Sequence, residues 1–393
     1  MSRSPRSLAL TLAGLTAIGP FAIDTYLPAF PAIAADLGAT RLEVQQSLTI
    51  YLAAFALMTL WHGALADALG RRRVVLWSLA MFFITSVACA LATQIEHLWI
   101  ARALQGVCAG AGMVVGRAVV RDLFDGREAQ RLMSTIQLLF ALAPAAAPII
   151  GGWVYGLFGW RAVFGFLALY AAVMWGVCWF RLPETLDPAH RRSLHPVKLA
   201  RDYLHMYSSP ALRALVIAVS MNFAGFFLYV MSAPAFLIDH LGVSPQGFAW
   251  LFGPTVAGMM TGSWLSRRLA GGMPQATQLR IAYAIMLAAA FINVAMNLLM
   301  PAALPWAVLP IALYNVGQAL AMPILSLLAL ELFPRSRGMV SSCQAFAQSL
   351  TNAAAAGLVV PLLWGEPLHL ACGMAGFILV GWLAWLRYRA KHP

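Results

Sequence analysis

Charged residues are scarce in this sequence, and their scarcity excludes a soluble fold. Only 10% of the 393 residues are Asp, Glu, Lys or Arg, whereas 61% are hydrophobic. A typical soluble domain carries about 25% charged residues. The hydrophobic residues also come in long runs, each near the roughly 20 residues that a helix needs to cross the core of a bilayer. The composition therefore predicts an all-α membrane protein.

Acidic residues are scarcer still: 14 Asp and Glu stand against 26 Lys and Arg, for a formal net charge of +12. A charge of this size can indicate a nucleic-acid partner. Here, however, the basic residues form short clusters between apolar runs, which is how membrane topology is encoded. We therefore expect no nucleic-acid partner and attribute the charge to orientation in the membrane.

Motifs of enzymes and metal sites are also missing. We find no Ser-His-Asp constellation, no His-Glu-x-x-His sequence and no phosphate-binding glycine loop. The cysteines all lie in apolar stretches without a close pair or metal-ligand spacing, so neither disulfides nor zinc is expected. The chain is therefore predicted not to be an enzyme, not to use ATP, and to need no metal or cofactor. The five cysteines are Cys89, Cys108, Cys178, Cys343 and Cys372.

Twelve apolar segments have the length of a membrane span. The first follows Arg3 and Arg6 and could be mistaken for a signal peptide, but it is too long and many more spans follow, so we expect it to be retained. The twelve predicted spans are residues 8–30, 44–66, 74–93, 98–120, 132–155, 162–181, 212–237, 248–267, 279–300, 305–332, 339–363 and 369–388.

One long polar connection, residues 182–211, divides the spans into two sets of six. It contains four prolines and several basic residues, which are typical of a linker between domains. We expect a cytoplasmic linker between a bundle of residues 1–181 and a bundle of residues 212–393. A degenerate repeat supports this division, because residues 262–268 resemble residues 63–67. Duplicated six-helix halves are an architecture of transporters.

The placement of the basic residues predicts the orientation. If the N-terminus is cytoplasmic, 22 of the 26 basic residues lie on the cytoplasmic side. The opposite side keeps Arg41 and Arg161, and Arg102 and Arg117 lie within spans. Positive charge accumulates on the cytoplasmic side of membrane proteins. We therefore expect a multi-pass protein of the inner (plasma) membrane with both termini in the cytoplasm.

Asp24 is the candidate site residue with the strongest physical argument. It lies about 24 Å along a helix from Leu8, in the outer half of the first span. An ionised carboxylate there costs several kcal/mol, so the side chain should be protonated or should find a cation. Arg102 reaches a similar depth and is the expected partner. The alternatives are an interfacial aspartate that starts the turn before Pro28, and an arginine that extends to the outer headgroups.

Four stretches of the first half resemble one transporter family. Residues 63–73 are similar to the signature between helices two and three of the major facilitator superfamily, and residues 98–106 to its helix-four motif. Residues 143–152 resemble the helix-five motif of antiporters, and residues 23–31 resemble the end of helix one in the Bcr/CflA drug-efflux group. The resemblance implies a 12-span drug:H+ antiporter made of two pseudo-symmetric six-helix bundles.

The resemblance also implies roles for individual residues. The arginine of the helix-four motif, Arg102, is implicated in proton coupling, so Asp24 and Arg102 are the proton-coupling candidates. Three positions depart from the family pattern: Ala68 stands where arginine is usual, Ala147 stands where glycine precedes proline, and an earlier glycine position of the helix-five motif is also alanine. The antiporter motif comprises Pro144, Pro148, Gly151 and Gly152, whose alternative role is simple small-residue packing.

A charged cluster at the inner surface could stabilise one of two conformations, and we call it the latch. Arginines at this place can instead be simple topological anchors. The latch comprises Gly63, Asp67, Gly70, Arg71, Arg72, Arg73 and Asp122.

The wall of a substrate cavity is harder to predict. Several polar residues lie within spans, where each needs a hydrogen-bond partner. Each could line a cavity, or could join neighbouring helices. Aromatic and methionine residues of the seventh span either form an adaptable apolar surface or face the lipid or the core of the bundle, as such residues more often do. The candidates are Tyr26, Gln45, Gln137, Asn222, Phe226, Tyr229, Asn315 and Gln318.

Together these features predict a secondary transporter that exports amphipathic, apolar small molecules in exchange for protons. Its partners would be the substrate, protons and the lipid bilayer, and we expect a functional monomer driven by the proton gradient. One alternative is an exporter of a defined metabolite, such as an amino-acid derivative, a sugar or a nucleoside. A more remote alternative is a membrane receptor or scaffold that transports nothing.

Overall fold

The computed structural model describes residues 5–124, 126–187, 195–270, 272–334 and 336–391, apart from some side chains of residues 5–6, 126–141 and 196. The described residues form helices and connecting turns, without strands. The chain divides into two compact units, Met1–His195 and Pro196–Pro393. The division falls within the predicted linker, where residues Pro196–Ser208 form a helix, α9.

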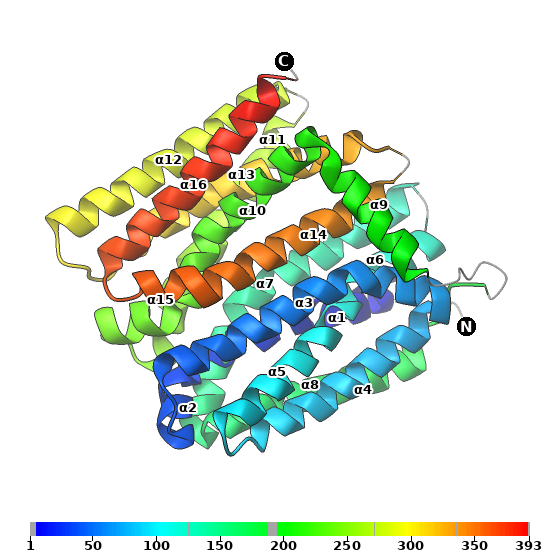
Figure 1. Ribbon diagram of the computed structural model, residues 1–393, viewed down its shortest axis with the longest axis horizontal. Helices are drawn as coiled ribbons and strands as arrows, with labels where there is room; N and C mark the ends of the chain where they lie inside the picture. The colour runs from blue at the N-terminus through cyan, green and yellow to red at the C-terminus, as the bar shows by residue number, and fades with distance from the viewer. Residues whose placement is uncertain (1–4, 125, 188–194, 271, 335, 392–393) are drawn as a thin grey trace. The chain divides into compact units, whose positions relative to one another are not determined.

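Unit 1 contains the first six predicted spans (Figure 1). Two spans are interrupted. The first breaks after Asp24, where Pro28 and Pro31 cannot donate backbone hydrogen bonds, and the fourth breaks at Gly110. The elements are α1 (Pro5–Asp24), η1 (Leu27–Ala29), α2 (Phe30–Leu37), α3 (Arg41–Leu69), α4 (Arg71–Ala90), α5 (Ile95–Ala109), α6 (Ala111–Leu123), α7 (Gly126–Phe158) and α8 (Trp160–Arg181).

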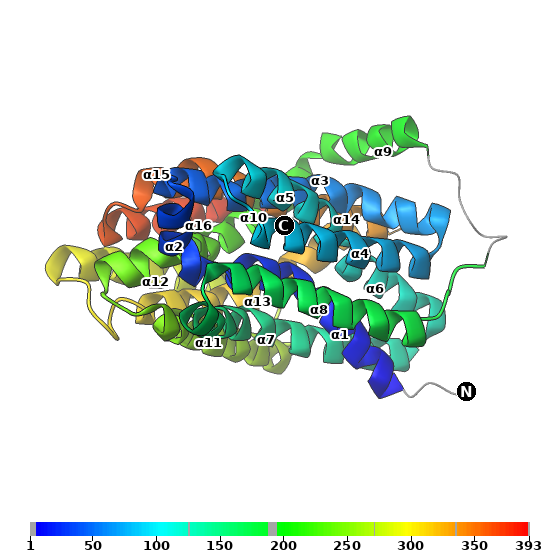
Figure 2. The ribbon, with the colours of Figure 1, turned by 90° about the horizontal axis from the view of Figure 1, so that it is seen from below.

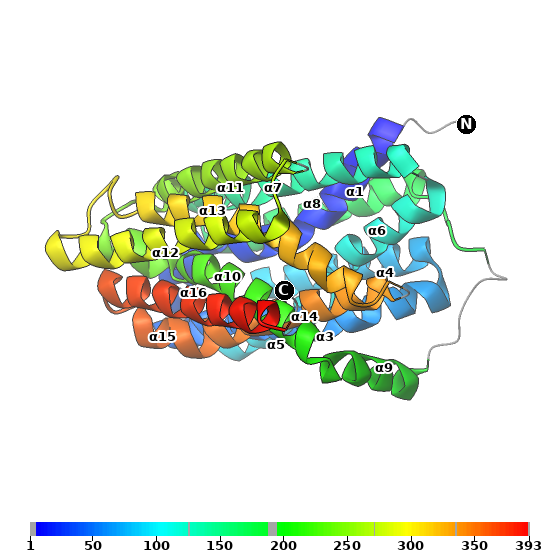
Figure 3. The same ribbon diagram turned by 90° about the horizontal axis from the view of Figure 1, so that it is seen from above.

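Unit 2 contains α9 and the remaining six predicted spans (Figure 1). Helix α13 packs against α11 and α12, and α10 runs along α16 (Figure 3). The elements after α9 are α10 (Pro210–Met231), η3 (Pro234–His240), η4 (Pro245–Phe248), α11 (Ala249–Leu269), α12 (Gln275–Leu299), α13 (Leu309–Glu331), α14 (Arg337–Ala354), η5 (Ala355–Val359), α15 (Val360–Leu363) and α16 (Pro367–Arg389).

Ten segments of the described chain are long and apolar enough to cross a membrane. The other two predicted spans correspond to α7 and α11. In α7 the apolar helical part is Leu142–Phe158, and α11 carries Arg267 and Arg268 in its last turn. The prediction of an all-α membrane protein is confirmed.

Local signals in the sequence explain several helix ends in unit 1. Helix α3 starts with a capping box, in which the Thr40 side chain accepts a hydrogen bond from the Glu43 amide and the Glu43 carboxylate accepts from the Thr40 amide. Helix α2 ends at Leu37 and is followed by Gly38, which has a positive φ of 61°. In the last turn of α2, Asp36 accepts hydrogen bonds from Trp160 and Arg161 and so ties α2 to α8.

Small residues allow the helices of unit 1 to pack closely. Helix α6 approaches α1 at Gly112, where an added Cβ would lie 2.5 Å from the carbonyl oxygen of Leu15. Close approach of this kind depends on small residues in membrane helices, since no hydrophobic effect drives the helices together in lipid. Elsewhere in unit 1, α4 and α8 run side by side (Figure 2).

Candidate functional site

Asp24 lies at the end of α1, where the chain leaves the regular helix before the short turn η1. Its side chain is buried, with only 3% of the residue exposed. One carboxylate oxygen, Oδ1, is buried without a hydrogen-bond partner among the described residues. A buried carboxylate oxygen without a partner is costly, so such groups call for a functional explanation.

Arg102, on α5, is completely buried between two aromatic rings. The centre of its guanidinium lies 4.4 Å from the ring centroid of Tyr26 and 4.2 Å from that of Tyr51. Its Nη1 donates to the Gln105 side chain, whose Nε2 in turn donates to Ser86 Oγ at 2.8 Å. Nε and Nη2 of Arg102 have no acceptor within the described part of the chain. The rings stabilise the cation through cation–π interactions, but its charge is not neutralised.

The expected ion pair between Asp24 and Arg102 is absent from this structure, since neither a salt bridge nor a hydrogen bond joins these two described residues. Tyr51 lies within electrostatic range of both, and its hydroxyl donates to the Gly19 carbonyl at 3.4 Å. The tyrosine rings thus hold the Arg102 cation, whereas Nε and Nη2, the donors that a carboxylate would use, have no acceptor among the described residues. Sequence reasoning missed Tyr51, because nothing in the local pattern says which face of α3 meets α5.

The other cavity candidates of unit 1 are Tyr26, which contacts Arg102, and the residues Gln45 and Gln137. Tyr26 is fully buried and its hydroxyl is 3.4 Å from Ser47 Oγ, so it joins η1 to α3. Gln45 is also buried, on α3. The side chain of Gln137 lies outside the described residues.

The antiporter motif packs directly against the segment that carries Asp24. Pro144 and Pro148 are accommodated inside α7. One turn later, a Cβ added to Gly151 would collide with the carbonyl oxygen of Thr25 and would lie 2.7 Å from its Cα. Only glycine fits there without moving the backbone. Gly151 therefore lets α7 approach the residue that follows Asp24, a contact that the sequence alone did not indicate.

At the other end of unit 1, Arg71 forms the centre of the latch. Its guanidinium pairs with Asp67 one turn earlier and with Asp122 at the end of α6, where Nε lies 3.2 Å from Oδ2. The Arg71 side chain is only 10% exposed. Gly70 precedes it with a φ of 102°, which favours glycine. The structure thus brings together the Asp67, Arg71 and Asp122 of the predicted cluster, while Gly63 lies on α3 two turns before.

Glu184 is a member of this cluster that sequence reasoning missed. Its carboxylate accepts hydrogen bonds from the backbone amides of Arg71 at 2.8 Å and Arg72 at 3.3 Å, so it caps the first turn of α4. The adjacent Thr185 donates to Asp122 Oδ2 at 2.8 Å. A carboxylate at a helix N-terminus is favourable for the helix dipole. The signal available in the sequence was the position of Glu184, an acidic residue shortly after the last predicted span of unit 1.

Arg72 and Arg73 differ from Arg71, because neither pairs with a described carboxylate. Arg72 donates from Nη2 to the Trp179 carbonyl at 2.6 Å and lies over the Trp179 ring. Arg73 is exposed.

The polar candidates of unit 2 form hydrogen bonds between neighbouring helices. Asn222 on α10 donates to the Tyr283 hydroxyl at 3.1 Å, and its backbone carbonyl accepts from Tyr314 at 2.8 Å. Tyr229 accepts from Asn293 at 2.7 Å. These contacts join α10 to α12 and α13, which matches the alternative interpretation of these residues as links between helices.

The other three candidates of unit 2 are buried as well. Asn315 donates to the Ile311 carbonyl of its own helix, while its Oδ1 has no partner in the described part of the chain. Gln318 donates to Met322 Sδ at 3.3 Å. Phe226 packs edge-on against Phe223.

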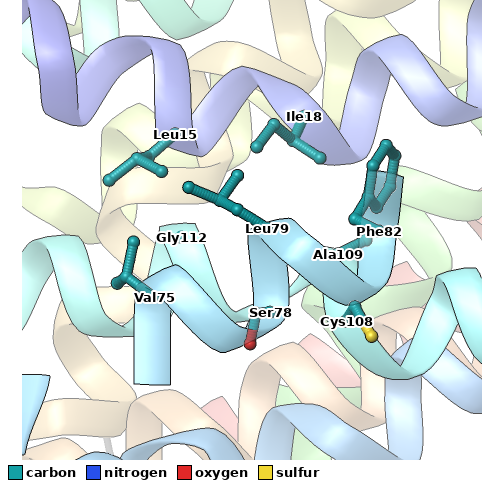
Figure 4. A pocket seen from close by; sticks show the side chains of 9 residues that line it. All are labelled: Leu15, Ile18, Val75, Ser78, Leu79, Phe82, Cys108, Ala109 and Gly112. Carbon is teal, nitrogen blue, oxygen red and sulfur yellow. The ribbon is translucent and has the colours of Figure 1, made fainter. Parts of the chain in front are cut away.

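A small cavity lies between α1, α4 and the helices α5 and α6 (Figure 4). Its volume of about 10 Å³ is close to the minimum for one water molecule, so it is no substrate site. Among the described residues, no group of three or more His, Cys, Asp or Glu could hold a metal ion.

Comparison with known proteins places these features in a family. A model of the Major Facilitator Superfamily matches residues 12–356. The chain is 36% identical over 278 residues to the uncharacterized MFS-type transporter YdgK of Bacillus subtilis, covering 70% of this chain and 69% of that protein. It is 32% identical to the bicyclomycin resistance protein homolog of Haemophilus influenzae, with 70% and 69% covered. It is 29% identical to the multidrug resistance protein MdtL of Escherichia coli, with 85% and 83% covered.

Solved structures share the fold at lower sequence identity. The human organic anion transporter MFSD10 superposes with a TM-score of 0.70 at 18% identity, covering 98% of this chain and all of the other. A peptide transporter, POT, gives 0.76 at 16% identity, with 97% and 93% covered. The family model, the relatives and the helical architecture agree that this chain belongs to the major facilitator superfamily of membrane transporters.

Proposed function

We propose that this chain exports amphipathic, apolar small molecules in exchange for protons. The observation that carries the proposal is Asp24, a buried carboxylate in a membrane span whose Oδ1 lacks a partner within the described chain. Ionisable residues inside the membrane mark substrate or proton pathways by default. Two relatives with names that refer to bicyclomycin and multidrug resistance support drugs as the substrate class.

Asp24 would carry the proton, and Arg102 would control its release. Protonated Asp24 needs no cation, and Arg102 is then held between Tyr26 and Tyr51. Loss of the proton leaves an anion in a region of low dielectric, where attraction to a nearby guanidinium is strong. The anion would draw Arg102 away from the rings, and this rearrangement would couple protonation to the movement of helices α1, α3 and α5.

The latch and the membrane orientation belong to the same proposal. The inner surface would carry Asp67, Arg71 and Asp122, whose ion pairs would stabilise one of two alternating states. We also propose that the protein acts as a monomer in the inner membrane, uses the proton gradient without a cofactor, and has cytoplasmic termini. Residues 182–211 would connect two six-helix bundles on the cytoplasmic side, with α9 lying within this connection.

A defined polar metabolite fits less well as the substrate. Asn222 Nδ2 donates to Tyr283 and Tyr229 accepts from Asn293, both on a neighbouring helix, while Asn222 Oδ1 has no partner among the described residues. The Asn222 amide nitrogen and the Tyr229 hydroxyl are thus engaged within unit 2, which leaves few groups of these residues to recognise a hydroxyl-rich or zwitterionic compound. Membership in a transporter family likewise argues against a receptor or scaffold.

The test uses inside-out membrane vesicles with an imposed pH gradient and a panel of fluorescent amphipathic compounds. In these vesicles export appears as uptake, so the wild-type chain should accumulate at least one compound in a gradient-dependent way. Asp24→Asn should abolish that dependence, since the amide cannot release a proton. The matched control is Asp36→Asn, which removes an exposed carboxylate at the C-terminal end of the same span.

Expression and elution of the variants in size-exclusion chromatography would establish that they fold. Uptake by Asp24→Asn with unchanged dependence on the pH gradient would contradict the role of Asp24. Wild-type uptake of sugars, nucleosides or amino-acid derivatives, with none of the amphipathic compounds, would support the metabolite alternative instead.

A further inference from the structure

A groove of about 610 Å³ lies on the surface of unit 1 between α4 and α8, next to the latch. We call it the α4–α8 groove. Its volume falls in the range of ligand sites. It is lined by Arg72, Arg73, Trp77, Met81, Trp175 and Trp179, together with smaller apolar residues and Glu184.

The groove is positively charged at the end where α4 begins. Arg73 is exposed and has no ion pair or hydrogen bond with any described residue. Arg72 uses Nη2 on the Trp179 carbonyl, while its Nε is buried without an acceptor within the described chain. The carboxylate of Glu184 accepts from four backbone amides, those of residues 71, 72, 185 and 186. Two cations therefore face the groove and its one carboxylate is already engaged.

The rest of the groove is apolar and faces outward. Trp77 is 72% exposed and Trp179 is 47% exposed, and Trp175 stacks on Trp179 with the ring centroids 5.0 Å apart. Arg73, Trp77 and Met81 follow one another at intervals of four residues, so they share one face of α4 and extend over about 12 Å. Both helices are apolar enough to be membrane spans, so this face meets lipid. Tryptophan is enriched where such a surface reaches the headgroups.

We propose that the α4–α8 groove binds one anionic phospholipid. The phosphate would lie at Arg72 and Arg73, and an acyl chain would run along Trp77, Met81 and Trp175. Basic pockets between membrane helices recognise lipid headgroups in this way. A free phosphate would leave the 12 Å apolar wall unused, and a zwitterionic headgroup would leave the two cations without a net counter-charge. The bound lipid would lie one residue from Arg71, beside the ion pairs of the latch.

The experiment measures lipid binding to the purified full-length chain in maltoside micelles by native mass spectrometry. The wild-type chain should bind its first dioleoyl phosphatidylglycerol more tightly than its first dioleoyl phosphatidylcholine. Arg73→Gln should weaken the first phosphatidylglycerol about fivefold, the factor that one arginine near an anionic lipid surface supplies. Arg73→Lys should retain most of the affinity, and Trp77→Ala should weaken both lipids.

The matched control is Arg267→Gln, which removes an exposed arginine in the last turn of α11 in unit 2, a residue that does not line the groove. This variant should bind phosphatidylglycerol as the wild-type chain does. Equal weakening by Arg267→Gln and Arg73→Gln would mean that general surface charge is responsible and would overturn the proposal. Displacement of the first phosphatidylglycerol by inorganic phosphate at the same concentration would overturn it as well, because the groove would then be a site for free anions.

Discussion

Replacing Gly151 with alanine tests how α7 positions the proton-coupling residue. The added Cβ would collide with the carbonyl oxygen of Thr25, and it would lie 2.7 Å from the Thr25 Cα, where ordinary contact begins at 3.4 Å. The two backbones must therefore move apart by at least about 0.7 Å. Because the obstacle is backbone rather than a flexible side chain, rotamer changes cannot relieve it. Asp24, the residue before Thr25, must move with it.

Gly151→Ala overpacks a tight contact, and overpacking of this kind lowers the free energy of unfolding by about 1–3 kcal/mol. Gly151→Ala should therefore lower the thermal stability of the purified protein and reduce pH-gradient-dependent uptake in inside-out vesicles. Gly165→Ala is the matched control. Gly165 lies on α8 with no other atom within 4 Å of an added Cβ, so alanine should be tolerated and should favour the helix by about 0.5–1 kcal/mol.

Two measurements separate this explanation from simple destabilisation. Thermal unfolding followed by size-exclusion chromatography gives the change in Tm, and uptake at a temperature well below both Tm values gives the change in function. Uptake should fall in Gly151→Ala even where the protein is fully folded. If Gly151→Ala had the same Tm and the same uptake as the wild-type chain, the argument that the approach of α7 to Thr25 needs glycine would be refuted.

The remaining predictions concern Arg102 and the cap of α4. Tyr51→Leu should impair proton-dependent uptake, because it removes a cation–π contact worth about 2 kcal/mol when desolvated. Tyr51→Phe keeps the ring and should retain most of the uptake. An equal loss of uptake in the two variants would assign the effect to the hydroxyl instead. Glu184→Ala should lower Tm through the loss of a helix cap worth about 0.5–2 kcal/mol. Its control, Glu96→Gln in the first turn of α5, should change Tm little, and an equal drop in both would contradict the capping role.

The sequence predicted much of the fold because hydropathy and charge act locally. Long apolar runs had to become helices, since a backbone in hydrocarbon must satisfy its own hydrogen bonds. Breaks within those helices were less visible. Residues 8–30 were predicted as one span, whereas the structure ends α1 at Asp24 and continues through η1 into α2. The prolines that cause the break were plain in the sequence, but their effect on the position of Asp24 was not.

Part of the latch was likewise predictable, because Asp67 and Arg71 lie one helical turn apart and opposite charges at that spacing meet. Asp122 was inferred from its place at the inner end of a span. The cap supplied by Glu184 could not be read in the same way. Glu184 lies 112 residues or more from the two α4 amides that it caps, and its approach depends on how α8 packs along α4.

By itself, the sequence determined that this protein crosses the membrane many times. It also determined which charged residues lie within spans, where a charge is energetically costly, and which transporter family the chain resembles. Only the tertiary structure decided what those charges touch. It holds Arg102 between Tyr26 and Tyr51 rather than against Asp24, and it brings Gly151 onto Thr25. The physical reason is that hydropathy sets how deep a residue lies, whereas its neighbours depend on the rotation of each helix, which close packing of distant segments determines.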